Sequence, residues 1–97
     1  MKTYYFKTSG TCSSGILLKV EGDLLQEVTY QGGCSGNTQG VAALAAGRTL
    51  DEVISLIRGI RCGMKPTSCP DQLAEALRMI KEGNISGRLQ LLEGAAN

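Results

Sequence analysis

The first third of the chain consists of short runs of apolar and β-prone residues separated by turn residues, which is typical of β-strands. Residues 3–7 are rich in β-prone side chains, and residues 16–20 form an apolar run after a Ser-Ser-Gly turn. The Glu-Gly-Asp sequence at 21–23 indicates a hairpin turn, and residues 24–30 follow it as a further strand. We therefore predict two or three antiparallel strands in this part of the chain.

The alternation within residues 24–30 also predicts which side chains face the core. Leu24, Val28 and Tyr30 are expected to share one face of the strand, with polar side chains on the other. Gln26 interrupts the apolar face, so the predicted register rests on the other three residues.

After the strands, the hydrophobic period lengthens to that of α-helices. Residues 38–46 are rich in alanine, and the glycine that follows them suits a helix C-terminus. A Thr-Leu-Asp-Glu capping box at 49–52 opens a second helix. Pro70 suits the first turn of a third helix, which should end near Gly83. The last two helices carry apolar stripes formed by Leu50, Val53, Ile54 and Ile57, and by Leu73, Ala76, Leu77 and Ile80.

Strands followed by helices predict an α+β fold, in which a small antiparallel sheet carries three helices on one face. Residues 88–93 are expected to add one or two helical turns near the end of the chain. No internal repeat divides the sequence, so we expect residues 1–97 to form one domain, with a core at about 4–82 and a tail at 84–97.

Composition and charge exclude several classes of function. The 97 residues carry a formal net charge of +1, which gives no long-range attraction to nucleic acid or to an anionic membrane. No apolar run approaches the length of a membrane span, and the N-terminal residues lack the pattern of a signal peptide. We therefore expect a cytoplasmic protein with reduced cysteines. Because aromatic residues make up only 4%, a bound metal or a homo-oligomer interface would help to stabilise the aliphatic core.

Four cysteines and the absence of histidine are the main chemical feature of the sequence. Each cysteine lies in a turn-like segment, whereas a buried structural cysteine usually lies within an apolar run. Two of them are expected at helix N-termini, where the helix dipole and unpaired N–H groups favour a thiolate. One end of the sheet and the helix ends can meet at one pole of such a fold, which would bring together Cys12, Cys34, Cys62 and Cys69.

Four thiolates without histidine suit a tetrahedral zinc ion or an iron–sulfur cluster. The spacing is less typical, because zinc ribbons use Cys-x₂-Cys pairs, whereas Cys62 and Cys69 have six residues between them. Thiol redox or catalytic chemistry is a second interpretation, in which Cys69 would be the most reactive thiol because it lies at a helix start. Burial of some cysteines as small apolar side chains is a third.

Two other features carry candidate chemistry. The Gly-Gly-Cys-Ser-Gly-Asn segment at 32–37 has the glycines of a phosphate-binding turn, but it lacks the sequence of a P-loop, so a tight turn is preferred. Arg58, Arg61 and Lys65 surround Cys62 and are candidate contacts for an anion or a protein partner, or a charge balance for thiolates. The alternative for these three residues is a solvated loop.

The Thr-Ser-Cys-Pro-Asp sequence at 67–71 spells the motif that names the TSCPD domain family. The segments at 32–37 and 59–63 also resemble blocks of that family, and the resemblance covers most of residues 4–82. It implies a free-standing member of a family that also forms the C-terminal portion of adenosylcobalamin-dependent ribonucleotide reductases. Because this chain lacks a reductase barrel, we do not expect a complete reductase. The resemblance implies a link to deoxynucleotide synthesis through a protein partner.

The order of elements also resembles that of IscU/NifU-type iron–sulfur scaffolds. Ser13 and Ser14 replace the acidic residue that usually follows the first scaffold cysteine, and Cys62 has no counterpart. A closed four-thiolate site is therefore favoured over a labile site for cluster transfer. The three scaffold cysteines correspond to Cys12, Cys34 and Cys69.

The sequence therefore predicts a metal-binding accessory or interaction module. An iron–sulfur scaffold or carrier is one alternative, and a thiol redox partner of a reductase is another. A closed site would favour a structural role, and an open coordination position would favour catalysis or transfer. The predicted ligands of the zinc or iron are Cys12, Cys34, Cys62 and Cys69.

Overall fold

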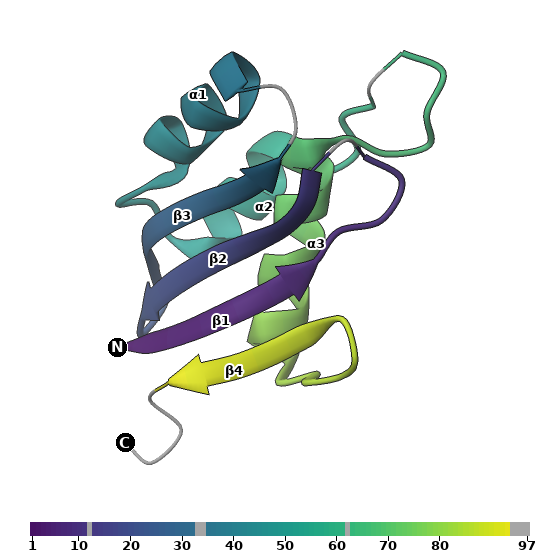
Figure 1. The fold of residues 1–97 in the computed structure, drawn as a ribbon. Helices are drawn as coiled ribbons and strands as arrows, with labels where there is room; N and C mark the ends of the chain where they lie inside the picture. The colour runs from purple at the N-terminus through teal and green to yellow at the C-terminus, as the bar shows by residue number, and fades with distance from the viewer. Residues whose placement is uncertain (12, 33–34, 62, 94–97) are drawn as a thin grey trace.

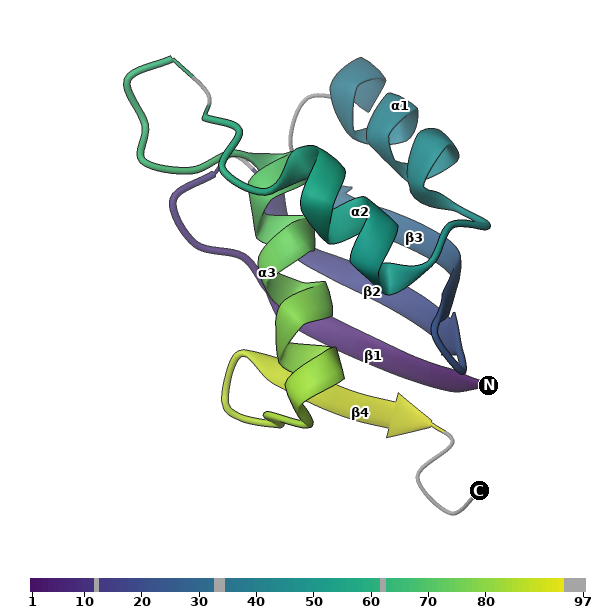
Figure 2. The ribbon, with the colours of Figure 1, turned by 180° about the vertical axis from the view of Figure 1, so that it is seen from behind.

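The computed structural model describes residues 1–11, 13–32, 35–61 and 63–93, and for residues 35–37 the backbone alone. Within these residues the fold is α+β, with a four-stranded antiparallel sheet and three helices on one side of it (Figure 1; Figure 2). The predicted class is confirmed, but the predicted number of strands is wrong. The elements are β1 (Lys2–Lys7), β2 (Ser13–Glu21), β3 (Leu24–Gly32), α1 (Ser35–Ala45), α2 (Leu50–Ile57), α3 (Cys69–Glu82) and β4 (Leu89–Glu93).

The additional strand, β4, is formed by residues that we expected to be helical. The strand order is β3-β2-β1-β4, so β4 pairs with the edge of β1 that β2 leaves open. Lys7 donates its backbone N–H to the carbonyl oxygen of Arg88 at 2.8 Å, just before this strand begins. Leu89 is fully buried, whereas Gln90 is exposed. Tertiary pairing therefore decides the structure of a segment whose local pattern is short and ambiguous.

The pairing of β2 with β3 contains an irregularity that changes which side chains face the core. The register shifts by one residue near the hairpin turn and leaves Gln26 without a partner on β2. This bulge turns Leu25 fully into the core and leaves Leu24 37% exposed, so the predicted inward position of Leu24 is wrong. Val28, beyond the bulge, is buried as predicted.

The helix ends follow the predicted local signals. At the start of α2, Thr49 accepts from the Glu52 N–H at 3.1 Å and donates its own N–H to the Glu52 carboxylate at 3.2 Å, which completes the capping box. Ser68 caps α3, and Gly83 ends it with a φ of +69°. Gly47, after α1, has a φ of +86°. Both glycines adopt a left-handed backbone that other residues rarely adopt.

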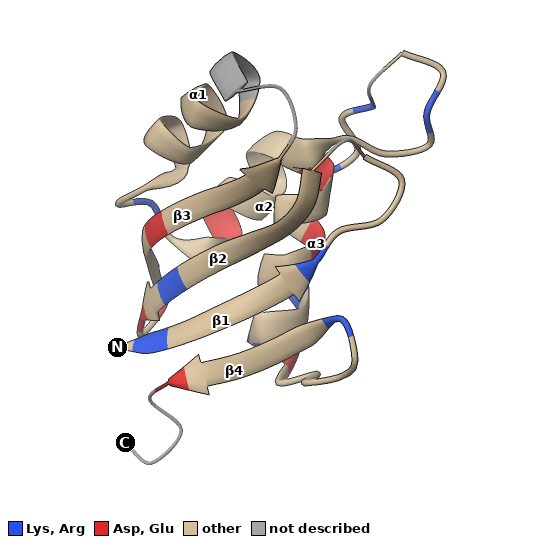
Figure 3. Ribbon diagram, viewed as in Figure 1, with Lys and Arg blue, Asp and Glu red and all other residues tan. Residues whose placement is uncertain are grey.

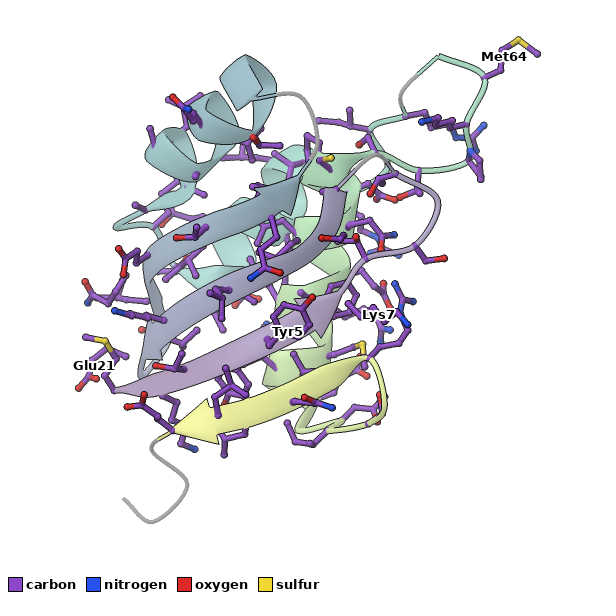
Figure 4. The ribbon with its side chains drawn as sticks, viewed as in Figure 1. Tyr5, Lys7, Glu21 and Met64 are labelled. Carbon is purple, nitrogen blue, oxygen red and sulfur yellow. The ribbon has the colours of Figure 1, made fainter. Side chains whose placement is uncertain are left out.

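The core lies between the sheet and the helical layer, with α3 crossing the back of the sheet (Figure 2). The opposite face of the sheet carries Tyr5, whose ring lies over Gly15 (Figure 4). The start of β2, the end of β3 and the start of α3 lie together at one end of the domain (Figure 1). The largest fully buried side chains are Phe6, Ile16, Leu18, Leu25, Val53, Leu73, Leu77 and Leu89.

Candidate functional site

Cys69 is the member of the predicted ligand set that the structure describes; Cys12, Cys34 and Cys62 lie outside the described residues. It is the first residue of α3, directly after the capping residue Ser68. Its side chain is buried, with 5% exposed. The position agrees with the predicted helix start, where unpaired backbone N–H groups stabilise negative charge.

The thiol of Cys69 contacts a buried hydroxyl group. Its Sγ lies 3.3 Å from the Oγ of Ser13, the first residue of β2. Ser13 Oγ in turn lies 3.0 Å from Thr11 Oγ1. Because a serine hydroxyl both accepts and donates, Ser13 can accept from the thiol or donate to a thiolate. The contact therefore suits either protonation state of Cys69.

Tyr30 holds the backbone of Cys69 from the end of β3. Its hydroxyl donates to the carbonyl oxygen of Cys69 at 2.8 Å. Burial raises the pKa of Tyr30 well above its ordinary value, and the nearby Cys69 raises it further. The phenol therefore stays protonated, and remains a donor, throughout the physiological pH range.

The described residues beside the other three cysteines also lie near the start of α3. Ser13 directly follows Cys12 and pairs across the sheet with Gly32, which lies two positions before Cys34. Ser68 donates its hydroxyl to the carbonyl oxygen of Ile60, two positions before Cys62, at 2.5 Å. Figure 1 shows the start of β2, the end of β3 and the start of α3 at the same end of the sheet. The described neighbours of all four cysteines thus meet at one pole, and the four-cysteine cluster stays a prediction.

Asp71 fixes the loop that leads into α3. One carboxylate oxygen accepts from the Thr67 hydroxyl at 2.5 Å, and the other accepts from the Gly59 N–H at 2.6 Å. Asp71 also lies in the first turn of α3, where its negative charge is favourable beside the positive end of the helix. Its two hydrogen bonds thus connect Gly59 and Thr67 to the start of α3.

Gln72, which sequence analysis did not single out, connects three segments near this pole. Its side-chain oxygen accepts from the Ser9 N–H at 3.1 Å and from an Arg88 guanidinium nitrogen at 2.8 Å. Its amide nitrogen donates to the Thr67 hydroxyl at 3.1 Å. Arg88 also lies over the ring of Phe6, 4.7 Å from its centroid. The sequence signal is a glutamine beside the apolar stripe of α3, but its partners become visible only in three dimensions.

The basic residues around Cys62 lie on the surface. Arg58, Arg61 and Lys65 are exposed, and none of them forms an ion pair with another described residue. Residues 58–68 contain no acidic residue, and Figure 3 shows basic positions on this projecting loop. The loop therefore presents positive charge to solvent, which leaves its role as an anion or partner contact a prediction.

Within the described ranges, no group of three or more cysteine, histidine or acidic side chains could hold a metal ion. Three of the four predicted ligands lie outside those ranges, so this result leaves the four-cysteine site untested.

The comparisons with known proteins identify the family. Residues 2–81 match the family model of the TSCPD domain. Because the match covers most of the chain, this α+β protein belongs to the TSCPD domain family. No curated protein and no solved structure matched the chain. In the part of the chain that the structure describes, no helix is long and apolar enough to cross a membrane.

Proposed function

We propose that Cys12, Cys34, Cys62 and Cys69 bind one metal ion, for which zinc is the best fit, and that the protein is a metal-stabilised accessory module. The observation that carries the proposal is the 3.3 Å contact between the Cys69 thiol and Ser13, the residue that directly follows Cys12. It lies at the pole where the described neighbours of the other cysteines meet.

The donor set and its surroundings fit a closed zinc site. Four thiolates and no histidine match the ligands of tetrahedral structural zinc. The start of α3 and the Ser13 hydroxyl offer partners to negative charge at Cys69. When bound, zinc would supply a cross-link among four chain segments.

A metal cross-link suits this fold energetically. The chain is short, and the aromatic content of 4% leaves the core to aliphatic side chains. A metal that binds only the folded state stabilises that state by mass action. We propose a partner among ribonucleotide reductases on the strength of the family resemblance alone.

The test is the metal content of the full chain after anaerobic purification. We expect about one zinc per chain, lost in single Cys→Ser variants at each of the four positions and kept in a Ser14→Ala control. Removal of the metal by a chelator should lower the melting temperature. The proposal would be overturned, and redox thiols favoured, if the purified protein contained no metal and the chelator left its melting curve unchanged.

An iron–sulfur scaffold or carrier is the second candidate, because Cys12, Cys34 and Cys69 match the scaffold cysteines in chain order. Brown protein with iron and inorganic sulfide, and without zinc, would favour it. In that case the Cys62→Ser variant should retain the cluster, whereas it should lose zinc in the closed four-thiolate site.

A further inference from the structure

Exposed apolar side chains gather along a groove between α1 and α2. The groove has a volume of about 200 Å³ and an almost entirely apolar lining. Leu44 of α1 is 72% exposed and Leu56 of α2 is 61% exposed. Exposed leucines on both sides of a groove are typical of a surface that binds another protein. The lining residues are Val41, Leu44, Ala45, Arg48, Val53, Leu56 and Ile57.

The two ends of this groove differ in charge. At the start of α2, Arg48 donates to the Leu44 carbonyl oxygen at 2.8 Å and pairs with Glu52 at 3.7 Å, so its charge is partly offset. At the other end, Arg58 directly follows α2 and forms no ion pair with a described residue. The positive charge continues along the following loop in Arg61 and Lys65.

Asp71 accepts hydrogen bonds from the N–H of Gly59, the residue after Arg58, and from the Thr67 hydroxyl. It forms no ion pair with Arg58 among the described residues. The groove therefore has an apolar floor, a balanced end at Arg48 and a basic end at Arg58.

We propose that the groove binds an amphipathic helical segment of a protein partner, with acidic residues at the end that meets Arg58. Such a segment would place apolar residues at i, i+3 or i+4, and i+7 along the floor. The eight-residue length of α2 corresponds to about 12 Å of helix, so two to three turns of partner helix match the groove. The basic end selects an acidic segment over a second copy of this chain, whose groove carries the same charge.

This inference identifies the chemistry of the partner in the proposed accessory function, and it does not require the metal site. None of the residues that line the groove is one of the four cysteines. Loss of partner binding with normal metal content would therefore reflect the groove, whereas loss of metal with normal binding would reflect the cysteine site.

The test uses the full chain and fluorescent helix-stabilised peptides of about 12 residues, with leucines on one face and glutamates at one end. Binding is measured by fluorescence anisotropy, and the contact surface by NMR shift changes. We expect binding to α1 and α2, and binding roughly tenfold weaker for a peptide of the same composition with its leucines scattered around the helix. Leu56→Ser should weaken binding by a similar factor, and the exposed Leu92→Ser on β4 should not.

Charge reversal separates specific docking from general stickiness. Arg58→Glu should weaken binding of the acidic peptide and strengthen binding of a matched peptide with lysine in place of glutamate. Lys7→Glu, at the end of β1 on another part of the surface (Figure 4), serves as the control.

Three results would overturn the proposal. One is failure of the peptide test, either because no acidic amphipathic peptide in the set binds or because Leu56→Ser and Leu92→Ser weaken binding equally. Another is a dimer in sedimentation that Leu56→Ser dissociates, since the groove would then be an interface between copies. The third is Arg58-dependent binding to vesicles of anionic lipid without peptide binding, which would make the surface a membrane contact.

Discussion

The hydroxyl of Tyr30 and the backbone carbonyl of Cys69 form a 2.8 Å hydrogen bond across 39 positions of the chain. The bond joins the end of β3 to the first residue of α3. Tyr30 lies on the sheet, so it fixes the helix start relative to the strands. Cys69 is therefore held from two sides, by Tyr30 at its backbone and by Ser13 at its side chain.

Tyr30→Phe removes this donor and keeps the ring. We expect the free energy of unfolding, measured by urea denaturation, to fall by about 1–2 kcal/mol. Tyr5→Phe is the matched control, because the Tyr5 hydroxyl makes an exposed 3.4 Å contact with Gln31 and should contribute less than about 0.5 kcal/mol. Equal losses in the two variants would mean that the Tyr30 hydroxyl has no special role.

The raised pKa of Tyr30 predicts how stability changes at alkaline pH. In the unfolded chain a tyrosine releases its proton near pH 10, whereas burial in the folded protein keeps Tyr30 protonated at higher pH. Above about pH 10 the folded state thus binds more protons than the unfolded state, so the free energy of unfolding should fall as the pH rises. Below about pH 10, the contribution of Tyr30 to the free energy of unfolding is fully present.

The measurement is a series of urea titrations between neutral pH and the onset of alkaline unfolding. Above about pH 10, the free energy of unfolding of the Tyr30→Phe variant should fall less steeply with pH than that of the unmodified protein. Some slope should remain, because burial also raises the pKa of Tyr4. Parallel curves for the two proteins would count against a protonated Tyr30 in the folded state.

The packing of Tyr5 over Gly15 predicts that the effect of Gly15→Ala on stability depends on the Tyr5 ring. A Cβ at position 15 would overlap the Tyr5 ring, so Gly15→Ala should displace the ring and destabilise the protein by roughly 1 kcal/mol. In a Tyr5→Ala background that overlap is gone. There Gly15→Ala should be neutral or stabilising, because alanine restricts the unfolded chain more than glycine does.

A double-mutant cycle of the unfolding free energies measures this coupling. The two substitutions should couple by about 0.5–1 kcal/mol or more. Strict additivity would show that the ring does not rest on Gly15 in solution.

The helix boundaries could be predicted because their signals are local. Thr49 and Glu52 are three positions apart, and both halves of their capping box form within one turn. Gly83 similarly ends α3 through its own backbone conformation. Such signals depend on neighbours in the sequence and not on how distant segments pack.

The features that were missed depend on distant partners. Residues 89–93 become a strand because β1 offers an open edge 83 to 90 positions earlier in the chain. The bulge at Gln26 depends on the pairing between β2 and β3. The three hydrogen bonds of Gln72 reach Ser9, Thr67 and Arg88, and no local pattern marks such a set.

The candidate site likewise has one part that local signals predict and another that depends on distant segments. Pro70 correctly placed Cys69 at the start of a helix. Its contacts with Ser13 and Tyr30 arise from segments 56 and 39 positions away, and they required the three-dimensional structure.

The burial of Cys69 predicts that its thiol reacts slowly in the folded protein. Its thiol is 5% exposed and rests against Ser13, so an alkylating reagent reaches it only when the start of α3 opens. In the metal-loaded protein all four cysteines should resist N-ethylmaleimide. After chelation under reducing conditions, Cys69 in the folded chain should react more slowly than Cys69 in protein unfolded in urea. The reaction is followed by peptide mass spectrometry, and protein unfolded in urea serves as the control, in which the four rates should become similar. The thiol redox hypothesis predicts the opposite for Cys69, because it requires an accessible, reactive thiol at the helix start. Fastest labelling of Cys69 in folded, metal-loaded protein would therefore reject the closed metal site and establish Cys69 as the reactive thiol.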